Sequence, residues 1–156
     1  MYQMILVPID GSATSERGLQ EAIKLGKLTG AKLRLIHVVD ELSFALTAGY
    51  GMVYPVDILG LLRSAGSEIL SKGQAQVQAQ GLEVDTVLND SFTGRVSDLV
   101  LAQVGICGAD LIVLGTHGRR GLGRLFMGSD AENIVRTSIT PVLLLRADLA
   151  ADNAGA

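Results

Sequence analysis

A segment rich in glycine and arginine, residues 115–129, holds the side chains best suited to bind a ligand. Its five glycines let the backbone adopt positive φ and approach a ligand closely. Three arginines also lie in it: Arg119, Arg120 and Arg124. The first acidic residue after them is Asp130. A helix pattern follows, and a helix N-terminus favours an anion through its free N–H groups and its dipole. The segment therefore predicts a negatively charged ligand such as a phosphate.

The same segment also has a purely structural interpretation. Ser129 and Glu132 form the pattern Ser-x-x-Glu, a capping box that would serve the helix with no ligand present. The glycines would then make only a flexible loop. The segment is neither a Walker P-loop, because it lacks the Gly-Lys-Ser/Thr ending, nor a Gly-x-Gly-x-x-Gly turn. From the residues alone, phosphate binding and an unliganded loop both stay open.

Alternating strand and helix patterns place this segment in an α/β fold. Strands are predicted at residues 2–9, 32–39, 83–88, 110–115 and 141–145. Helices are predicted from Ser12 or Thr14 to Gly30, from Asp57 to about Gln80, from Thr93 or Gly94 through Val104, and at residues 129–138. Such alternation implies parallel strands joined by right-handed helical crossovers. We therefore expect a three-layer, doubly wound sandwich around a five-stranded parallel sheet.

Length and composition suit one domain, which we expect at residues 1–146, followed by a flexible tail at residues 147–156. The chain has 156 residues, of which 48% are hydrophobic and 19% charged, enough for a real core. The formal net charge of −3 argues against general binding to nucleic acid or membrane surfaces. The single cysteine, Cys107, excludes a disulfide within the chain, and a half-buried, unreactive thiol is expected there.

The distribution of apolar residues also indicates in which cellular compartment to expect the protein. No apolar run approaches the roughly 20 residues that a membrane helix needs. Residues 1–10 lack the basic start and the small-residue cleavage site of a signal peptide. We therefore expect a soluble cytoplasmic protein. The irregular link at residues 40–56 is assigned no role. His37 lies inside an apolar strand, and we expect it to be a hydrogen-bonded core residue.

Two strand ends carry unusual residues, and both belong to the predicted parallel sheet. The first strand ends in Pro8-Ile9-Asp10-Gly11-Ser12, and the fourth ends in Gly115-Thr116-His117-Gly118. Ligands of open parallel sheets bind beyond the carboxyl ends of strands, at the point where the strand order reverses. We expect these two ends to meet there and form the site.

At these residues the chain resembles the universal stress protein family. The spacing Gly115-x2-Gly118-x9-Gly128-Ser129 resembles the ATP-binding motif of that family. Similarity extends to the first strand end, to Leu35-Ile36-His37-Val38-Val39-Asp40, and to Ala131-Glu132 followed by Pro141-Val142-Leu143-Leu144. It covers about residues 4–146. The resemblance implies a Rossmann-like fold of the adenine nucleotide α-hydrolase-like type, with ATP, and Mg²⁺, as ligand.

The resemblance also implies a role for particular residues. Asp10 would lie beside the nucleoside, and the backbone of Val38 would pair with adenine. Gly115 and Gly118 would pass close to the ribose and phosphate, while Gly128 and Ser129 would hold the phosphates. The expected nucleotide-binding residues are Pro8, Asp10, Val38, Gly115, Thr116, His117, Gly118, Arg119, Gly128, Ser129 and Asp130.

Asp130 departs from the family pattern, in which nucleotide-binding members usually have an apolar residue after the serine. A carboxylate there suits the helix dipole but would repel a triphosphate. The arginines of the preceding segment would offset part of that repulsion. Alternatively, Asp130 would hold the Mg²⁺ that bridges the phosphates. The two interpretations predict opposite effects of removing the carboxylate.

These features favour a nucleotide-dependent sensor or adaptor in the stress response, acting on a protein partner that the sequence does not identify. Alternatives are a slow ATP hydrolase or adenylyl-transfer enzyme, or a dimeric interaction module that has lost nucleotide binding, which Asp130 would explain. The sequence identifies no general base or arginine finger, which argues against an enzyme. The apolar last strand, residues 141–145, predicts a homodimer, because an exposed apolar edge invites pairing.

Overall fold

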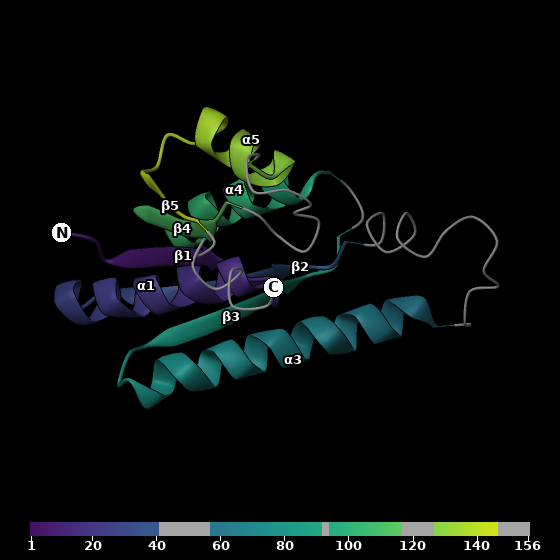
Figure 1. The fold of residues 1–156 in the computed structure, drawn as a ribbon, viewed down its shortest axis with the longest axis horizontal. Helices are drawn as coiled ribbons and strands as arrows, with labels where there is room; N and C mark the ends of the chain where they lie inside the picture. Colours follow the sequence, from purple (N-terminus) through teal and green to yellow (C-terminus); the bar gives the residue numbers. More distant parts are fainter. Residues whose placement is uncertain (41–56, 92–93, 117–126, 147–156) are drawn as a thin grey trace, which may run out of the picture.

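A computed structural model describes residues 1–40, 57–91, 94–116 and 127–146 (Figure 1). In these ranges five strands and four helices alternate. In chain order they are β1 (Met4–Pro8), α1 (Ala13–Thr29), β2 (Lys32–Val38), α3 (Ile58–Ala79), β3 (Val84–Asn89), α4 (Val96–Cys107), β4 (Leu111–Gly115), α5 (Ser129–Thr137) and β5 (Val142–Leu145). Most of the predicted link and the whole predicted tail lie outside the described residues.

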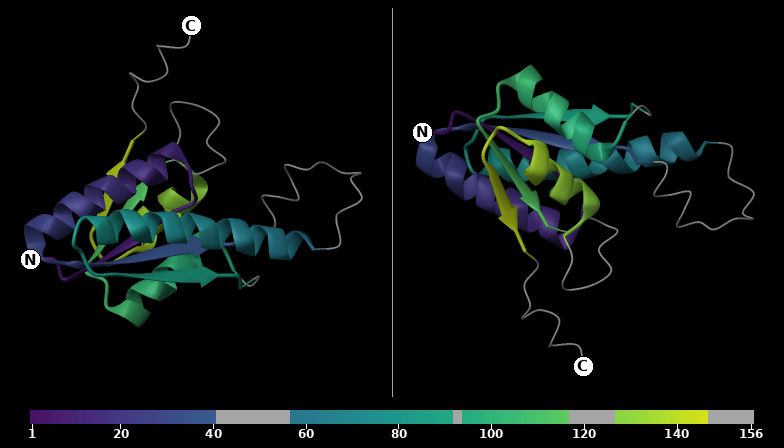
Figure 2. Two further views of the ribbon diagram at one scale, coloured as in Figure 1. Left: turned by 90° about the horizontal axis from the view of Figure 1, so that it is seen from below. Right: turned by 90° about the horizontal axis from the view of Figure 1, so that it is seen from above.

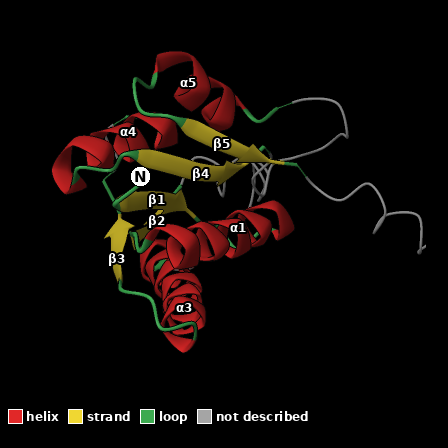
Figure 3. Ribbon diagram, turned by 90° about the vertical axis from the view of Figure 1, so that its left-hand side faces the viewer, coloured by secondary structure: helices red, strands yellow, loops and turns green. Residues whose placement is uncertain are grey.

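All five strands are parallel, in the order β3-β2-β1-β4-β5. The chain builds outward from β1 through β2 to β3, then crosses back through α4 to place β4 on the other side of β1. Helices α1 and α3 cover one face of the sheet, and α4 and α5 cover the other (Figures 2 and 3). The predicted three-layer, doubly wound fold is confirmed.

The sheet divides the core into two layers, which explains the nearly continuous apolar runs of the central strands. On β1, Ile5 and Val7 pack toward α1 and α3, whereas Leu6 packs toward α4 and α5. On β4, Val113 and Ile112 alternate in the same way. Each of these side chains is fully buried, because both faces of a parallel sheet are covered by helices.

Two of the predicted helix starts are confirmed. Ser12 caps α1 by accepting a hydrogen bond from the Ser15 amide at 3.2 Å. Asp57 caps α3 in the same way, through the Gly60 amide at 2.8 Å. Helix α4 begins later than predicted, with Arg95 as its N-cap. Gly94 has a φ of 108°, outside the helical region, so it belongs to the turn before the helix.

His37 is a buried, hydrogen-bonded core residue, as predicted. Its Nδ1 lies 2.8 Å from the carbonyl oxygen of Ile9 and is placed to donate to it, which joins β2 to the end of β1. The ring packs against α3 at Gly66, where a Cβ would lie 2.5 Å from the ring carbon Cδ2. Because that hydrogen bond holds the ring, the helix can approach the sheet only with glycine at this position. Cys107, at the end of α4, is a half-buried free thiol, as expected.

No helix within the described ranges has the length and apolar character needed to cross a bilayer.

The contact between Gly66 and His37 leads to a stability prediction. Gly66→Ala should lower the free energy of unfolding by about 1–3 kcal/mol, because the added methyl overpacks a ring that cannot move. Gly105→Ala on α4 is the matched control, since a Cβ there meets nothing within 4 Å. It should raise stability by about 0.5–1 kcal/mol through helix propensity. Urea unfolding of both variants measures the difference, and equal stability of the two would contradict this packing.

Candidate functional site

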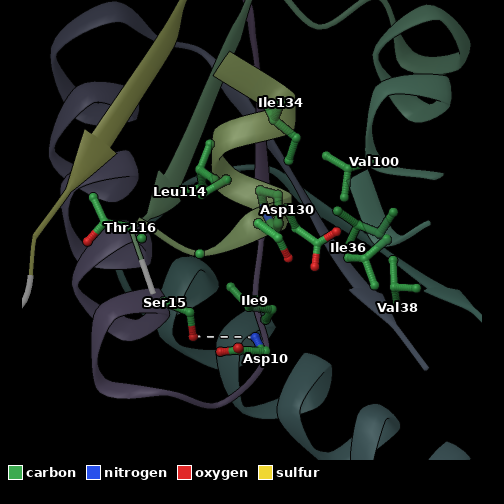
Figure 4. Close-up of a pocket in the computed structure, with 16 residues that line it drawn as sticks. Ile9, Asp10, Ser15, Ile36, Val38, Val100, Leu114, Thr116, Asp130 and Ile134 are labelled. Carbon is green, nitrogen blue, oxygen red and sulfur yellow. Dashed lines mark hydrogen bonds between the residues drawn. The ribbon is translucent and has the colours of Figure 1, made fainter. Parts of the chain in front are cut away.

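A pocket of about 150 Å³ opens at the carboxyl ends of β1 and β4 (Figure 4). The strand order reverses between these two strands, so the connections that follow them diverge to opposite faces of the sheet. The predicted meeting of the first and fourth strand ends is confirmed.

Every expected binding residue in the described part of the chain lines this pocket. They are Pro8, Asp10, Val38, Gly115, Thr116, Gly128, Ser129 and Asp130. The other three, His117, Gly118 and Arg119, lie outside the described residues. Segments far apart in the sequence therefore contribute to one cavity, as the resemblance implies.

The sequence reasoning missed most of the apolar floor. The remaining lining residues are Ile9, Ser15, Ile36, Val96, Val100, Leu114, Ala131 and Ile134. Most are ordinary core side chains, and nothing local distinguishes them from their neighbours. Ile36 is an exception, because it lies two residues before Val38 and therefore on the same face of β2. Ile9 and Ala131 could also have been found, because each adjoins a predicted site residue in the sequence.

The turn between β1 and α1 places the Asp10 carboxylate at the pocket. Its Oδ1 accepts a hydrogen bond from the Ser12 amide at 2.9 Å, across Gly11, whose φ is 80°. The Asp10 amide donates to the Ser15 hydroxyl at 3.3 Å, and that hydroxyl donates to the Ser12 carbonyl at 3.0 Å. These bonds hold the turn and the start of α1 together, so Asp10 and Ser15 have defined positions in the wall of the pocket.

Gly115 lets the first turn of α1 pack directly on the end of β4. A Cβ at Gly115 would lie 2.8 Å from both the carbonyl carbon and the Cβ of Thr14. The resemblance places this glycine near the ribose and phosphate. The packing against Thr14 gives it a second requirement, since any side chain here would push α1 away from the pocket.

Thr116 joins the two ends of the glycine-rich segment. Its amide donates to the Leu145 carbonyl at 2.8 Å, and its carbonyl accepts from the Gly128 amide at 2.8 Å. The chain thus leaves β4 and returns at the start of α5 within hydrogen-bonding distance. This contact places the N-terminus of α5 beside the end of β4, at the rim of the pocket.

The predicted capping box at Ser129 is wrong. Gly128, with extended backbone at φ −60° and ψ 147°, is the N-cap of α5, and Ser129 is the first helical residue. The serine hydroxyl is therefore one position too late to cap the helix. The N-cap glycine has no side chain to cap α5, and first-turn residues of the helix line the pocket. The amides of that turn are placed to bind an anion.

Asp130 caps the neighbouring helix, a role the sequence did not reveal. Its Oδ1 accepts a hydrogen bond from the Ser97 amide, in the first turn of α4, at 3.2 Å. Ser97 is fully buried, and its hydroxyl accepts from Asn133 Nδ2 at 2.8 Å. We call Asp130, Asn133 and Ser97 the α4–α5 clasp. The two carboxylates in the pocket wall, Asp10 and Asp130, are the residues there that are suited to hold a cation such as Mg²⁺.

Comparison with known proteins shows the family and the fold to which the chain is similar. The model of the universal stress protein family matches residues 1–146. A universal stress protein of Methanocaldococcus jannaschii is 30% identical over 146 residues, which cover 94% of this chain and 83% of that protein. A solved structure of another protein of that organism, MJ0577, matches with a TM-score of 0.81 at 23% identity, over 96% of this chain and 99% of that one.

Among the solved structures that match are complexes with a nucleotide. The universal stress protein from Archaeoglobus fulgidus in complex with dAMP matches with a TM-score of 0.66 at 23% identity. The match covers 92% of this chain and 98% of that one, and it shows a shared fold.

The α4–α5 clasp leads to a second stability prediction. Asn133→Ala should lower the free energy of unfolding by about 1–2 kcal/mol, because it removes a hydrogen bond to a buried hydroxyl. A double-mutant cycle with Ser97→Ala isolates the contact. Urea unfolding of the four proteins measures the coupling, with Glu132→Ala, an exposed neighbour, as the control. Additive effects of the two clasp substitutions would contradict this contact.

Proposed function

We propose, from the premise that this chain belongs to the universal stress protein family, that it binds an adenine nucleotide in the pocket and acts as a nucleotide-dependent sensor or adaptor in the stress response. One observation carries the proposal: every described residue that the resemblance assigns to the nucleotide lines a single cavity at the reversal of strand order. We expect this activity in the cytoplasm, on a protein partner still to be identified.

The chemistry of the pocket suits the parts of a nucleotide. Val38 and Val96 are half-buried apolar side chains of the lining against which the faces of a base can pack. The Asp10 carboxylate can accept hydrogen bonds from ribose hydroxyls. At the start of α5, backbone amides and the helix dipole favour a phosphate. The pocket therefore has an apolar part for the base and polar groups for the sugar and phosphate.

The dAMP complex of a protein with the same fold supports a nucleotide as the ligand. The family motif implies ATP with Mg²⁺ as one such nucleotide, and occupancy of the pocket by its nucleotide is the signal that we propose a partner detects. A single-turnover assay with purified protein tests whether the bound ATP is hydrolysed slowly.

Ser129→Asp tests the phosphate site without disturbing the core. Ser129 is exposed and lies in the first turn of α5, where a carboxylate suits the helix dipole but repels a phosphate. We expect the affinity for AMP to fall by about tenfold or more, and the affinity for adenosine to change by less than about twofold. Isothermal titration calorimetry measures both affinities.

Ser71→Asp is the matched control, because Ser71 is an exposed serine on α3 and gains the same charge away from the pocket. Its affinities should equal those of the wild type. If the wild-type protein binds neither adenosine, AMP nor ATP, the proposed function is wrong. If Ser129→Asp binds AMP as tightly as the control does, the phosphate lies elsewhere.

We also propose a homodimer through β5. This strand is an edge of the sheet, and it pairs with β4 on one side. The Pro141 carbonyl accepts from the Ile112 amide at 2.9 Å, and the Leu145 carbonyl accepts from the Thr116 amide, just after β4, at 2.8 Å. Alternate residues of a strand face the same neighbour, so the backbone groups of Val142 and Leu144 face the open edge. An edge of this kind is suited to pair with a second copy.

Val142→Lys tests the dimer. A lysine at an edge strand opposes pairing through its charge, while its stem still covers apolar surface. Sedimentation should give a dimer for the wild type and a monomer for this variant. Leu28→Lys, at an exposed position near the end of α1, is the control and should stay dimeric. A wild type that sediments at 16.4 kDa across micromolar concentrations would contradict the dimer.

A further inference from the structure

Two helix N-termini approach the pocket, and they differ in what they already bind. Residues at the starts of α4 and α5 both line the cavity. At α4, the Ser97 amide donates to the Asp130 carboxylate at 3.2 Å. At α5, the N-cap is Gly128, which has no side chain to accept from the amides of the first turn. An anionic ligand therefore meets, at α5, a helix whose N-cap has no side chain and, at α4, a first turn in which the Ser97 amide is already bound to a carboxylate.

We propose that Asp130 determines how many phosphates the pocket accepts, and that it makes the site favour a nucleoside monophosphate over a nucleoside triphosphate. This inference rests on the proposed function, because it concerns the ligand of the same site. It assigns a specificity role to a side chain that the structure also uses to cap α4.

The position of the Asp130 carboxylate is fixed by the fold. Its acceptor bond to Ser97 ties it to a fully buried residue, and Asn133 holds the hydroxyl of that residue at 2.8 Å. If the carboxylate swung away from an arriving phosphate, the Ser97 amide in the first turn of α4 would lose its acceptor. Asp130 is therefore held in the pocket wall and cannot readily retreat from added negative charge.

Asp130 lies at the starts of both α4 and α5, and the partial positive charge of each helix N-terminus stabilises its carboxylate. The carboxylate keeps its formal negative charge, which still repels further anions brought close to it. Asp10 supplies a second carboxylate to the same wall (Figure 4, Asp130 at the start of α5 and Asp10 lower in the view, beyond Ile9). A first phosphate gains the amides of α5. Each further phosphate adds charge near these carboxylates without gaining another uncapped helix terminus.

Asp130→Asn tests the inference, because it removes the charge while the amide oxygen can still accept from Ser97. Affinities for adenosine, AMP and ATP are measured by calorimetry, with Mg²⁺ and with a chelator. Relative to the wild type, we expect ATP to bind about tenfold more tightly or better, AMP about threefold more tightly, and adenosine equally well. The gain for ATP should be largest in the chelator, because Mg²⁺ screens the phosphates.

Glu132→Gln is the matched control. Glu132 is an exposed carboxylate in the same turn of α5 and does not line the pocket. It should change each affinity by less than about twofold, which separates a local effect of Asp130 from a general effect of net charge. The arginines of the glycine-rich segment are present in all three proteins, so their contribution cancels in the comparison.

An unchanged ratio of ATP to AMP affinity in Asp130→Asn would overturn the inference and leave the proposed function intact. Weaker ATP binding by this variant in Mg²⁺ alone would also overturn it, and would make Asp130 a metal ligand. If no nucleotide or nucleoside binds to the wild type or the variant, both proposals fail. Asp130→Ser, which also keeps an acceptor for Ser97, repeats the measurement should Asp130→Asn be poorly folded.

Discussion

The reversal of strand order between β1 and β4 is the constraint on which the rest of this structure depends. Parallel strands require crossovers, and crossovers are right-handed, so the chain must change faces when it returns from β3 to β4. That change places α4 and α5 opposite α1 and α3. It also leaves the carboxyl ends of the two central strands without a helix directly above them, and the pocket opens there.

Close backbone packing then gives the pocket its walls. Gly115 lets α1 approach β4, and the bonds of Thr116 bring the start of α5 to the same rim. Polar groups of the turn at Asp10 are fixed by hydrogen bonds before any ligand arrives. A site built from short contacts between regular elements is largely preorganised, so less ordering is needed on binding.

Stability and ligand choice are linked at Asp130. The same carboxylate satisfies an amide of α4 and contributes negative charge to the pocket. The negative charge of Asp130, which stabilises the start of α4, therefore also affects which anions can bind at the start of α5. This link follows from the packing of α4 on α5, because neither helix by itself brings the carboxylate near Ser97.

The sequence by itself determined the α/β class, the order of the elements and the strand ends that carry the site, because apolar periodicity, glycines and caps act over a few residues. Ser12 and Asp57 were predicted as caps for that reason. Only the tertiary structure decided the apolar floor and the partner of Asp130, because Val100, Ile134 and Ser97 come from separate segments of the chain. It also moved the cap of α5 from Ser129 to Gly128, since the hydrogen bond between Gly128 and Thr116 sets where that helix begins.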